Sequence, residues 1–161
     1  MVKNILIQIV FFALIFNVLS YFKELPMLDK GTELATEQIV LSDLKQEQQP
    51  LFESGKTQII YFFAPWCQIC HASISNLQSI YVDKPSVSIK AVALDYSSVN
   101  EIRQFASQHD LSFPILLGDS ELKKMFKIQG YPSYYVLNKR GEVKAKSLGY
   151  STELGLNIRS L

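Results

Sequence analysis

Two continuous apolar runs stand out along the chain, and each is followed by apolar residues at helical spacing. The runs TQIIYFFA and VSIKAVALD are typical of strands buried on both faces. After the first run, a single helical stripe predicts that Cys70 faces inward, together with Ile74, Leu77 and Tyr81. After the second run, VNEIRQFASQHDL carries its apolar residues on one face. This alternation of strand and helix predicts an α/β domain.

The last third of the chain predicts a different connection between strands. FPILLGD and SELKKMF indicate a short strand and a short helix, and PSYYVLN and GEVKAKSL indicate two strands joined by a turn at Asn138–Gly141. The last of these strands alternates apolar residues with lysine, which is typical of a strand near a sheet edge. The final stretch, STELGLNIRSL, predicts a weak helix. The strand–helix alternation earlier in the chain predicts parallel strands, and the hairpin at its end predicts antiparallel ones. Together they predict a mixed central sheet flanked by helices on both faces.

The N-terminal stretch is apolar in another way, because the segment from Ile5 to Phe22 contains no charged residue. As a helix it would be about 27 Å long, close to the hydrocarbon thickness of a bilayer. A single lysine, Lys3, on its short N-terminal side favours an N terminus in the cytoplasm. A signal peptide cut before Tyr21 is the alternative, and both would export the remainder. We therefore expect a cytoplasmic stub at 1–4, a transmembrane anchor at 5–22, a tether at 23–37, a short strand within EQIVL, and an exported domain at 38–161.

Composition limits the partners that this domain can bind. The 161 residues carry 16 Lys and Arg against 15 Asp and Glu, so no basic field is present to hold nucleic acid. The two cysteines, Cys67 and Cys70, lie three residues apart, and none remains for a structural disulfide of the kind that exported domains use. The pair therefore indicates working chemistry. Followed by His71, it fits three chemistries: thiol–disulfide exchange, half of a zinc site, and covalent haem attachment.

The position of the motif favours thiol–disulfide exchange. The residues PWC break the first strand, and a helix is expected to begin close to Cys67. A helix N terminus carries a partial positive charge and unpaired N–H groups, which favour the thiolate form that attacks disulfides. We expect Cys67 to be the accessible nucleophile and Cys70, one turn further and shielded, to be the resolving thiol. This reaction needs no cofactor and no metal.

These motifs resemble those of the thioredoxin-like superfamily. FFAPWCQIC is similar to its strand, Trp-Cys-x-x-Cys motif and helix, and GYPSYYVLNKRGEV is similar to its Gly-x-Pro segment and following hairpin. LSFPILLGDSELKKMF resembles the extra strand–helix insert of the membrane-anchored, exported TlpA/ResA-like branch. The resemblance runs from Glu37 to Ser160 and implies a thioredoxin-like fold. It also implies a single-pass inner-membrane protein with its domain in the periplasm, serving cytochrome c maturation or related thiol homeostasis.

The resemblance implies roles for residues around the two thiols. Pro132 would follow a cis peptide bond and pack against the sulfurs, so that the backbone of Tyr131 turns toward an incoming client segment. Trp66 would cover the site. His71 is either a solvated or capping residue of the first helical turn or a residue that tunes the charge of the thiolate.

Three positions depart from the pattern of the resembling families. Thioredoxins carry a buried acid six residues before the first cysteine, where Tyr61 stands here, and some exported relatives carry an acid where Ser73 stands. The proton acceptor for Cys70 is therefore open, with water and His71 as candidates. Ala64 occupies the place of the threonine that a peroxiredoxin-type peroxidase would have.

The expected protein is a membrane-anchored periplasmic thiol–disulfide oxidoreductase that uses a Cys67–Cys70 dithiol to reduce disulfides of protein clients. Because the exported space is oxidising, a reductant there needs an electron donor, and a membrane thiol carrier would suit this role. A thiol oxidase or isomerase with the same site is one alternative. A module of another class, which binds metal or haem through Cys67, Cys70 and His71, is the other.

Overall fold

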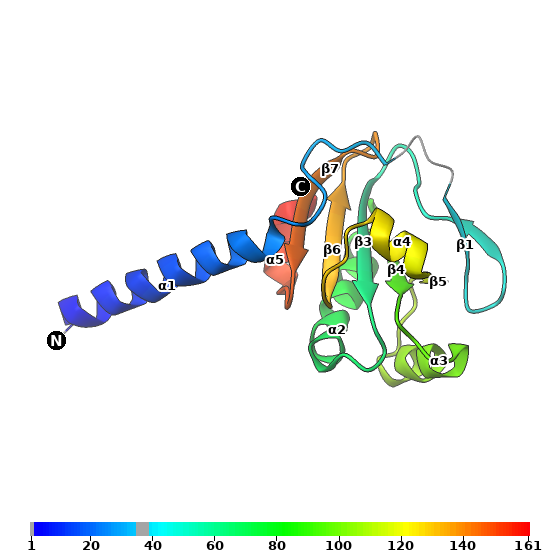
Figure 1. The fold of residues 1–161 in the computed structure, drawn as a ribbon, viewed down its shortest axis with the longest axis horizontal. Helices are drawn as coiled ribbons and strands as arrows, with labels where there is room; N and C mark the ends of the chain where they lie inside the picture. The colour runs from blue at the N-terminus through cyan, green and yellow to red at the C-terminus, as the bar shows by residue number, and fades with distance from the viewer. Residues whose placement is uncertain (1, 35–38) are drawn as a thin grey trace.

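A five-stranded mixed sheet forms the centre of the molecule in the computed structural model, which describes residues 2–34 and 39–161 (Figure 1). The strand order is β5-β4-β3-β6-β7, so the hairpin strand with the alternating lysines lies at an edge, as predicted. β3 pairs in parallel with β4, and β4 with β5, whereas β6 runs antiparallel to both β3 and β7. The strands span β3 (Thr57–Phe63), β4 (Val87–Ala93), β5 (Ile115–Leu117), β6 (Ser133–Leu137) and β7 (Val143–Leu148).

Helices cover both faces of this sheet, as the sequence predicted (Figure 1). One buried cluster joins the sheet to α2, α3 and α5, and a second joins the opposite face to α4. Successive side chains of a strand point to opposite faces, and β3 therefore contributes Tyr61 and Phe63 to the first cluster and Phe62 to the second. The helices span α2 (Gln68–Asp83), α3 (Val99–Gln108), α4 (Ser120–Met125) and α5 (Glu153–Ser160).

Aromatic contacts tie the end of β3 to the helices on each side. The rings of Phe63 and Phe105 stack with centroids 4.6 Å apart, and those of Phe62 and Phe126 lie 4.8 Å apart. The stripe of α2 differs from the sequence prediction at its end, because Ile80 is buried while Tyr81 is only partly so. Tyr81 nevertheless packs against the same buried cluster, where its ring meets that of Phe113 edge to face with centroids 5.9 Å apart. The contacts of Phe62 and Phe63 hold the end of β3 in place where the cysteine motif begins.

The segment that the sequence assigned to a tether packs against the domain over part of its length. Met27, Leu28 and Leu34 are buried in the second cluster, and the N–H of Leu28 donates to the Tyr135 hydroxyl at 3.1 Å. The N–H of Gly31 donates to the carbonyl of Val143 at 2.8 Å. The sequence did not predict the burial of Met27, Leu28 and Leu34, since no periodic pattern marks these three apolar residues. Part of the strand expected within EQIVL lies outside the described residues; β1 (Val40–Ser42) follows and pairs with β2 (Gln48–Pro50).

The helix α1 (Val2–Glu24) precedes this segment and extends away from the domain (Figure 1). It contains the whole stretch 5–22 that the sequence assigned to a membrane span. Within the residues that the structure describes, no helix combines the length and the apolar character that a membrane crossing requires. The membrane span therefore stays a prediction.

Candidate active site

The junction of β3 and α2 places Cys67 at the cap of a helix. The Cys67 backbone is extended, with φ −82° and ψ 109°, and its carbonyl accepts the N–H of His71 at 3.1 Å. Its sulfur accepts the N–H of Cys70 at 3.2 Å, so a thiol here takes the part that a serine or aspartate oxygen takes at most helix caps. The N–H of Cys67 donates to the carbonyl of Ala64 at 3.0 Å, which closes the turn out of the strand. The helix thus begins where the sequence predicted.

Cys67 is less accessible than the sequence suggested. Its side chain is 7% exposed and that of Cys70 is 0% exposed, and both are free thiols. Capping turns the Cys67 sulfur toward the first turn of the helix, where it joins the buried cluster together with Ala64. The predicted order still holds, because Cys70 lies on the inward stripe of α2. Burial first, and then the hydrogen bond from Cys67, raise the pKa of the Cys70 thiol far above its ordinary value.

Strand pairing brings a distant proline to this junction. β6 runs antiparallel to β3, and Ser133 at the start of β6 pairs with Phe62 near the end of β3. The Tyr131–Pro132 peptide immediately before β6 is cis, which is the geometry that the resemblance implied. Tyr131 is partly buried and packs against the cluster that contains both cysteines. Residues 64 positions apart in the chain therefore meet at one end of the sheet.

A cluster that the sequence did not predict holds Trp66 and Tyr131 over the site. Trp66 is 61% exposed, and its indole N–H donates to the backbone carbonyl of Asp95 at 2.8 Å. The Tyr131 hydroxyl donates to the Asp95 carboxylate at 2.9 Å, and the rings of Trp66 and Tyr131 meet edge to face at 5.8 Å. Lys123 forms an ion pair with Asp95 and lies 5.4 Å from the centroid of the Tyr131 ring. Asp95 thus positions both aromatic side chains by accepting a hydrogen bond from each.

The sequence contained only weak signals for this cluster. Asp95 ends a predicted strand, which favoured a turn, and Lys123 stands among three lysines, which favoured a solvated helix face. Asp95 has φ +49°, in the left-handed region that aspartate tolerates better than most residues. The hydrogen bond from Lys123 is the largest cause that lowers the pKa of Asp95, so the ion pair is intact at neutral pH and is lost only at a pH below the ordinary pKa of an aspartate.

We predict that Asp95→Asn impairs reduction of protein disulfides more than reduction of a small disulfide. Asparagine keeps the left-handed backbone at this position. It removes the negative charge of the carboxylate that pairs with Lys123 and accepts the hydrogen bond of Tyr131. A lost hydrogen bond to a charged group corresponds to roughly a tenfold effect, so we expect the KM for insulin to rise about three- to tenfold. The rate with 5,5′-dithiobis(2-nitrobenzoate) should change less than about twofold.

Asp110→Asn is the matched control for this variant. Asp110 also has a positive φ, at +48°, and is exposed at the end of α3. An equal rise in KM for both variants would assign the effect to the left-handed backbone position and would contradict a role for the Asp95 charge.

His71 fixes the loop before the cysteines instead of contacting a thiol through its ring. Its Nε2 lies 2.9 Å from the carbonyl of Pro65, which can only accept, so this nitrogen carries the proton. Its Nδ1 lies 2.8 Å from Nε2 of His109 at the end of α3, and burial followed by the charge of His71 lowers the pKa of His109. Both ring nitrogens of His71 are thus engaged, which disfavours haem or metal ligation by this residue. Among the described residues, no group of three or more His, Cys, Asp and Glu side chains is placed to hold a metal ion.

A helix-capping thiol, a second thiol behind it, and a cis-proline at the end of a mixed sheet are found together in one class of enzyme, the thioredoxin-like thiol–disulfide oxidoreductases. This protein is a member of that class. It belongs to the AhpC/TSA family, whose model matches residues 28–146.

Individual relatives agree with this assignment. The thioredoxin-like protein YneN of Bacillus subtilis is 30% identical over 121 residues, which cover 70% of this chain and 69% of the relative. The thiol-disulfide oxidoreductase ResA of Oceanobacillus iheyensis is 29% identical over 144 residues, which cover 87% of this chain and 74% of the relative. The crystal structure of StoA from Bacillus subtilis matches with a TM-score of 0.68 and 26% identity, over 76% of this chain and 96% of that one.

Proposed function

We propose that this protein is a membrane-anchored reductant that transfers electrons to disulfides of exported client proteins through Cys67 and Cys70. The observation that carries the proposal is the geometry of the cap, where the Cys67 sulfur accepts the N–H of Cys70 and both thiols are free. This hydrogen bond lies in the first turn of α2, so the two side chains share one end of the helix. A pair so placed can close into a disulfide within that turn.

The reaction divides between the two thiols according to their burial. The Cys67 thiolate attacks one sulfur of a client disulfide, so that a mixed disulfide forms and one client thiol is released. Cys70 then gives up its proton and attacks the Cys67 sulfur. The Cys67–Cys70 disulfide forms, the bond to the client breaks, and the second client sulfur leaves as a thiol after taking a proton. The client has gained two electrons and two protons, and the enzyme has lost them.

Trp66, Tyr131 and Pro132 support this exchange by framing the approach to Cys67. The edge-to-face contact between the rings of Trp66 and Tyr131 forms one wall. Beside it, the backbone before β6 is turned by the cis peptide bond. An extended client segment can pair with that backbone as an additional strand. His71 acts indirectly in this proposal, because its hydrogen bond to Pro65 holds the loop that carries Trp66.

Support for the membrane anchor comes from α1. The apolar side chains of Ile9, Phe12 and Leu14 are 59%, 67% and 60% exposed. Such a surface is stabilised by transfer from water to lipid. The proposed arrangement is a single pass through the inner membrane with the domain in the periplasm, where a membrane thiol carrier would return the enzyme to its dithiol form. Apocytochrome thiols in cytochrome c maturation are the proposed clients, as the resemblance of the sequence motifs to the TlpA/ResA-like branch implies.

A redox titration tests the direction of electron flow. Trp66 is the one tryptophan of the chain and lies beside Cys67, so its fluorescence can report the state of the pair in glutathione buffers. We expect a midpoint potential below that of glutathione, as a reductant requires. Cys70→Ala, which cannot close the disulfide, should show no transition and is the control. A midpoint well above that of glutathione would contradict the reductant and favour an oxidase or isomerase with the same site.

A further inference from the structure

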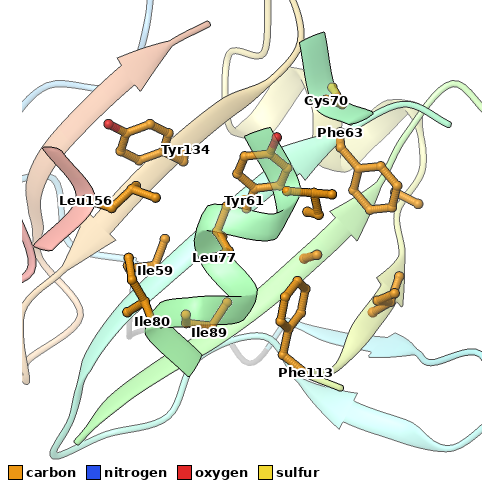
Figure 2. Packing of buried hydrophobic residues seen from close by; sticks show 14 of the residues in the cluster. Ile59, Tyr61, Phe63, Cys70, Leu77, Ile80, Ile89, Phe113, Tyr134 and Leu156 are labelled. Atoms are coloured by element: carbon orange, nitrogen blue, oxygen red, sulfur yellow. The ribbon is translucent and has the colours of Figure 1, made fainter. Parts of the chain in front are cut away.

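Two buried hydroxyl groups lie beneath the resolving thiol. Tyr61 of β3 and Ser73 of α2 are each 0% exposed, and their hydroxyl oxygens are 2.6 Å apart. Ser73 stands three residues after Cys70, so the two lie on the same side of the helix. Figure 2 shows the Tyr61 ring pointing its hydroxyl toward the end of the cluster that holds Cys70. The three polar groups thus lie among the apolar side chains of the first buried cluster, such as Phe63, Ile74 and Leu77.

Tyr61 and Cys70 lie in the same buried cluster, where the Tyr61 hydroxyl points toward the end that holds Cys70 (Figure 2). The Tyr61 hydroxyl lowers the pKa of the thiol, against the larger effect of burial, which raises it. Burial first, and then the charge of Cys70, raise the pKa of Tyr61 itself well above its ordinary value. Tyr61 therefore keeps its proton and can act only as a hydrogen-bond donor toward an ionised sulfur.

Each hydroxyl carries one proton and can accept another hydrogen bond, so the pair has two arrangements. In one, Tyr61 donates to Ser73. In the other, Ser73 donates to Tyr61, and the Tyr61 proton is free to point at Cys70. The second arrangement stabilises a negative sulfur in a place that water does not reach, and no carboxylate is required for it.

We propose that Tyr61, oriented by Ser73, is the group that stabilises the Cys70 thiolate when it attacks the mixed disulfide. This inference rests on the proposed thiol–disulfide exchange and concerns its second step. As Cys70 loses its proton, the Tyr61 hydroxyl turns from Ser73 to the sulfur, and the Ser73 hydroxyl turns to the Tyr61 oxygen. The new sulfur–sulfur bond then removes the negative charge from Cys70, the departing client thiolate takes up the proton that Cys70 has given up, and the hydroxyl pair returns to its first arrangement. Tyr61 is thus a catalytic residue, and Ser73 is a positioning residue.

Two side chains act on Cys70: Cys67 at the cap of α2 and Tyr61 of β3. A backbone hydrogen bond with Ala64, just after β3, also lowers the pKa of the thiol. Tyr131, from the loop before β6, packs against the same buried cluster. The charged groups of Asp95 and Lys123 contact Tyr131, Asp95 through a hydrogen bond from the hydroxyl and Lys123 over the face of the ring. His71 on α2 is engaged by Pro65 and His109.

Reaction of the reduced protein with 5,5′-dithiobis(2-nitrobenzoate) tests the proposal, because the two thiols release nitrothiobenzoate in successive phases. The first phase reports attack by Cys67, and the second reports displacement by Cys70 from the Cys67 adduct. In Tyr61→Phe we expect an unchanged first phase and a second phase slowed about tenfold at neutral pH. The pH midpoint of the second phase should rise by about one pH unit, a change that loss of packing alone would not produce. Ser73→Ala should slow the second phase about threefold.

Tyr134→Phe is the matched control, since Tyr134 is equally buried in the same cluster but its hydroxyl pairs with Arg159. Its second phase should match the wild-type protein. A second phase with wild-type rate and pH midpoint in Tyr61→Phe would overturn the proposal, and if that variant does not fold, a wild-type second phase in Ser73→Ala would overturn it. Absence of two phases in the wild-type protein would instead contradict the proposed exchange itself.

Discussion

Replacing Cys67 by serine is expected to abolish disulfide reduction, with a loss of about three orders of magnitude or more in the rate of insulin reduction. A serine hydroxyl can still cap α2, because it can accept the N–H of Cys70 as the sulfur does. It cannot form a disulfide, and an alcohol is not ionised at neutral pH. The fold should therefore survive while the first step is lost, which circular dichroism and the insulin turbidity assay can measure together.

Ser75→Ala is a suitable control for Cys67→Ser, because Ser75 is exposed on the same helix and away from the thiols. Its activity should match that of the wild-type protein. If Cys67→Ser retained even a tenth of the wild-type rate, Cys67 would not be the attacking thiol.

Replacing Cys70 by alanine is expected to stop the reaction halfway. Cys67 can still attack a client, but the mixed disulfide has no buried thiol to resolve it, so turnover should fall by about two to three orders of magnitude while covalent adducts accumulate. The small alanine side chain fits the fully buried position, at the cost of a small cavity. Non-reducing electrophoresis of the variant, expressed in cells and purified after alkylation, measures the adducts.

The double variant Cys67→Ser with Cys70→Ala separates specific from adventitious adducts. It lacks both thiols and should trap nothing. Adducts of equal amount in the single and double variants would show that Cys67 does not form them. A Cys70→Ala protein that traps no client and turns over at the wild-type rate would contradict the division of roles between the two thiols.

Much of the fold could be predicted because it follows from local patterns. The strands near Thr57 and Val87 are continuous apolar runs, and their burial on both faces follows from the helices that cover both sides of the sheet. The start of α2 was predictable because the residues PWC break the strand, and Cys67, the last of them, caps the helix. Burial of Met27, Leu28 and Leu34 was not, since two adjacent apolar residues and one further leucine carry no periodic signal.

The surroundings of the site could be predicted only as far as the resemblance reached. It predicted roles for Trp66, Tyr131 and Pro132, whereas the hydrogen bonds at Asp95 and its ion pair with Lys123 were missed. Asp95 lies in the loop after β4 and Lys123 lies in α4, and in the sequence each looks like an ordinary surface residue. Their contact exists because β4 and α4 end beside the loop that precedes β6.

The sequence by itself determined that two thiols lie one helical turn apart at the end of a buried strand, because the residues that form the strand, end it and begin the helix follow one another directly in the chain. Only the tertiary structure decided how far each thiol is shielded and which groups face it. Tyr61 and Ser73 show this most clearly: in the sequence they are two positions without the acids of related proteins, and in the structure they are hydrogen-bonded partners beneath Cys70. Side chains from separate elements meet according to how the sheet and helices pack, and the distance between two hydroxyl groups depends on that packing as a whole.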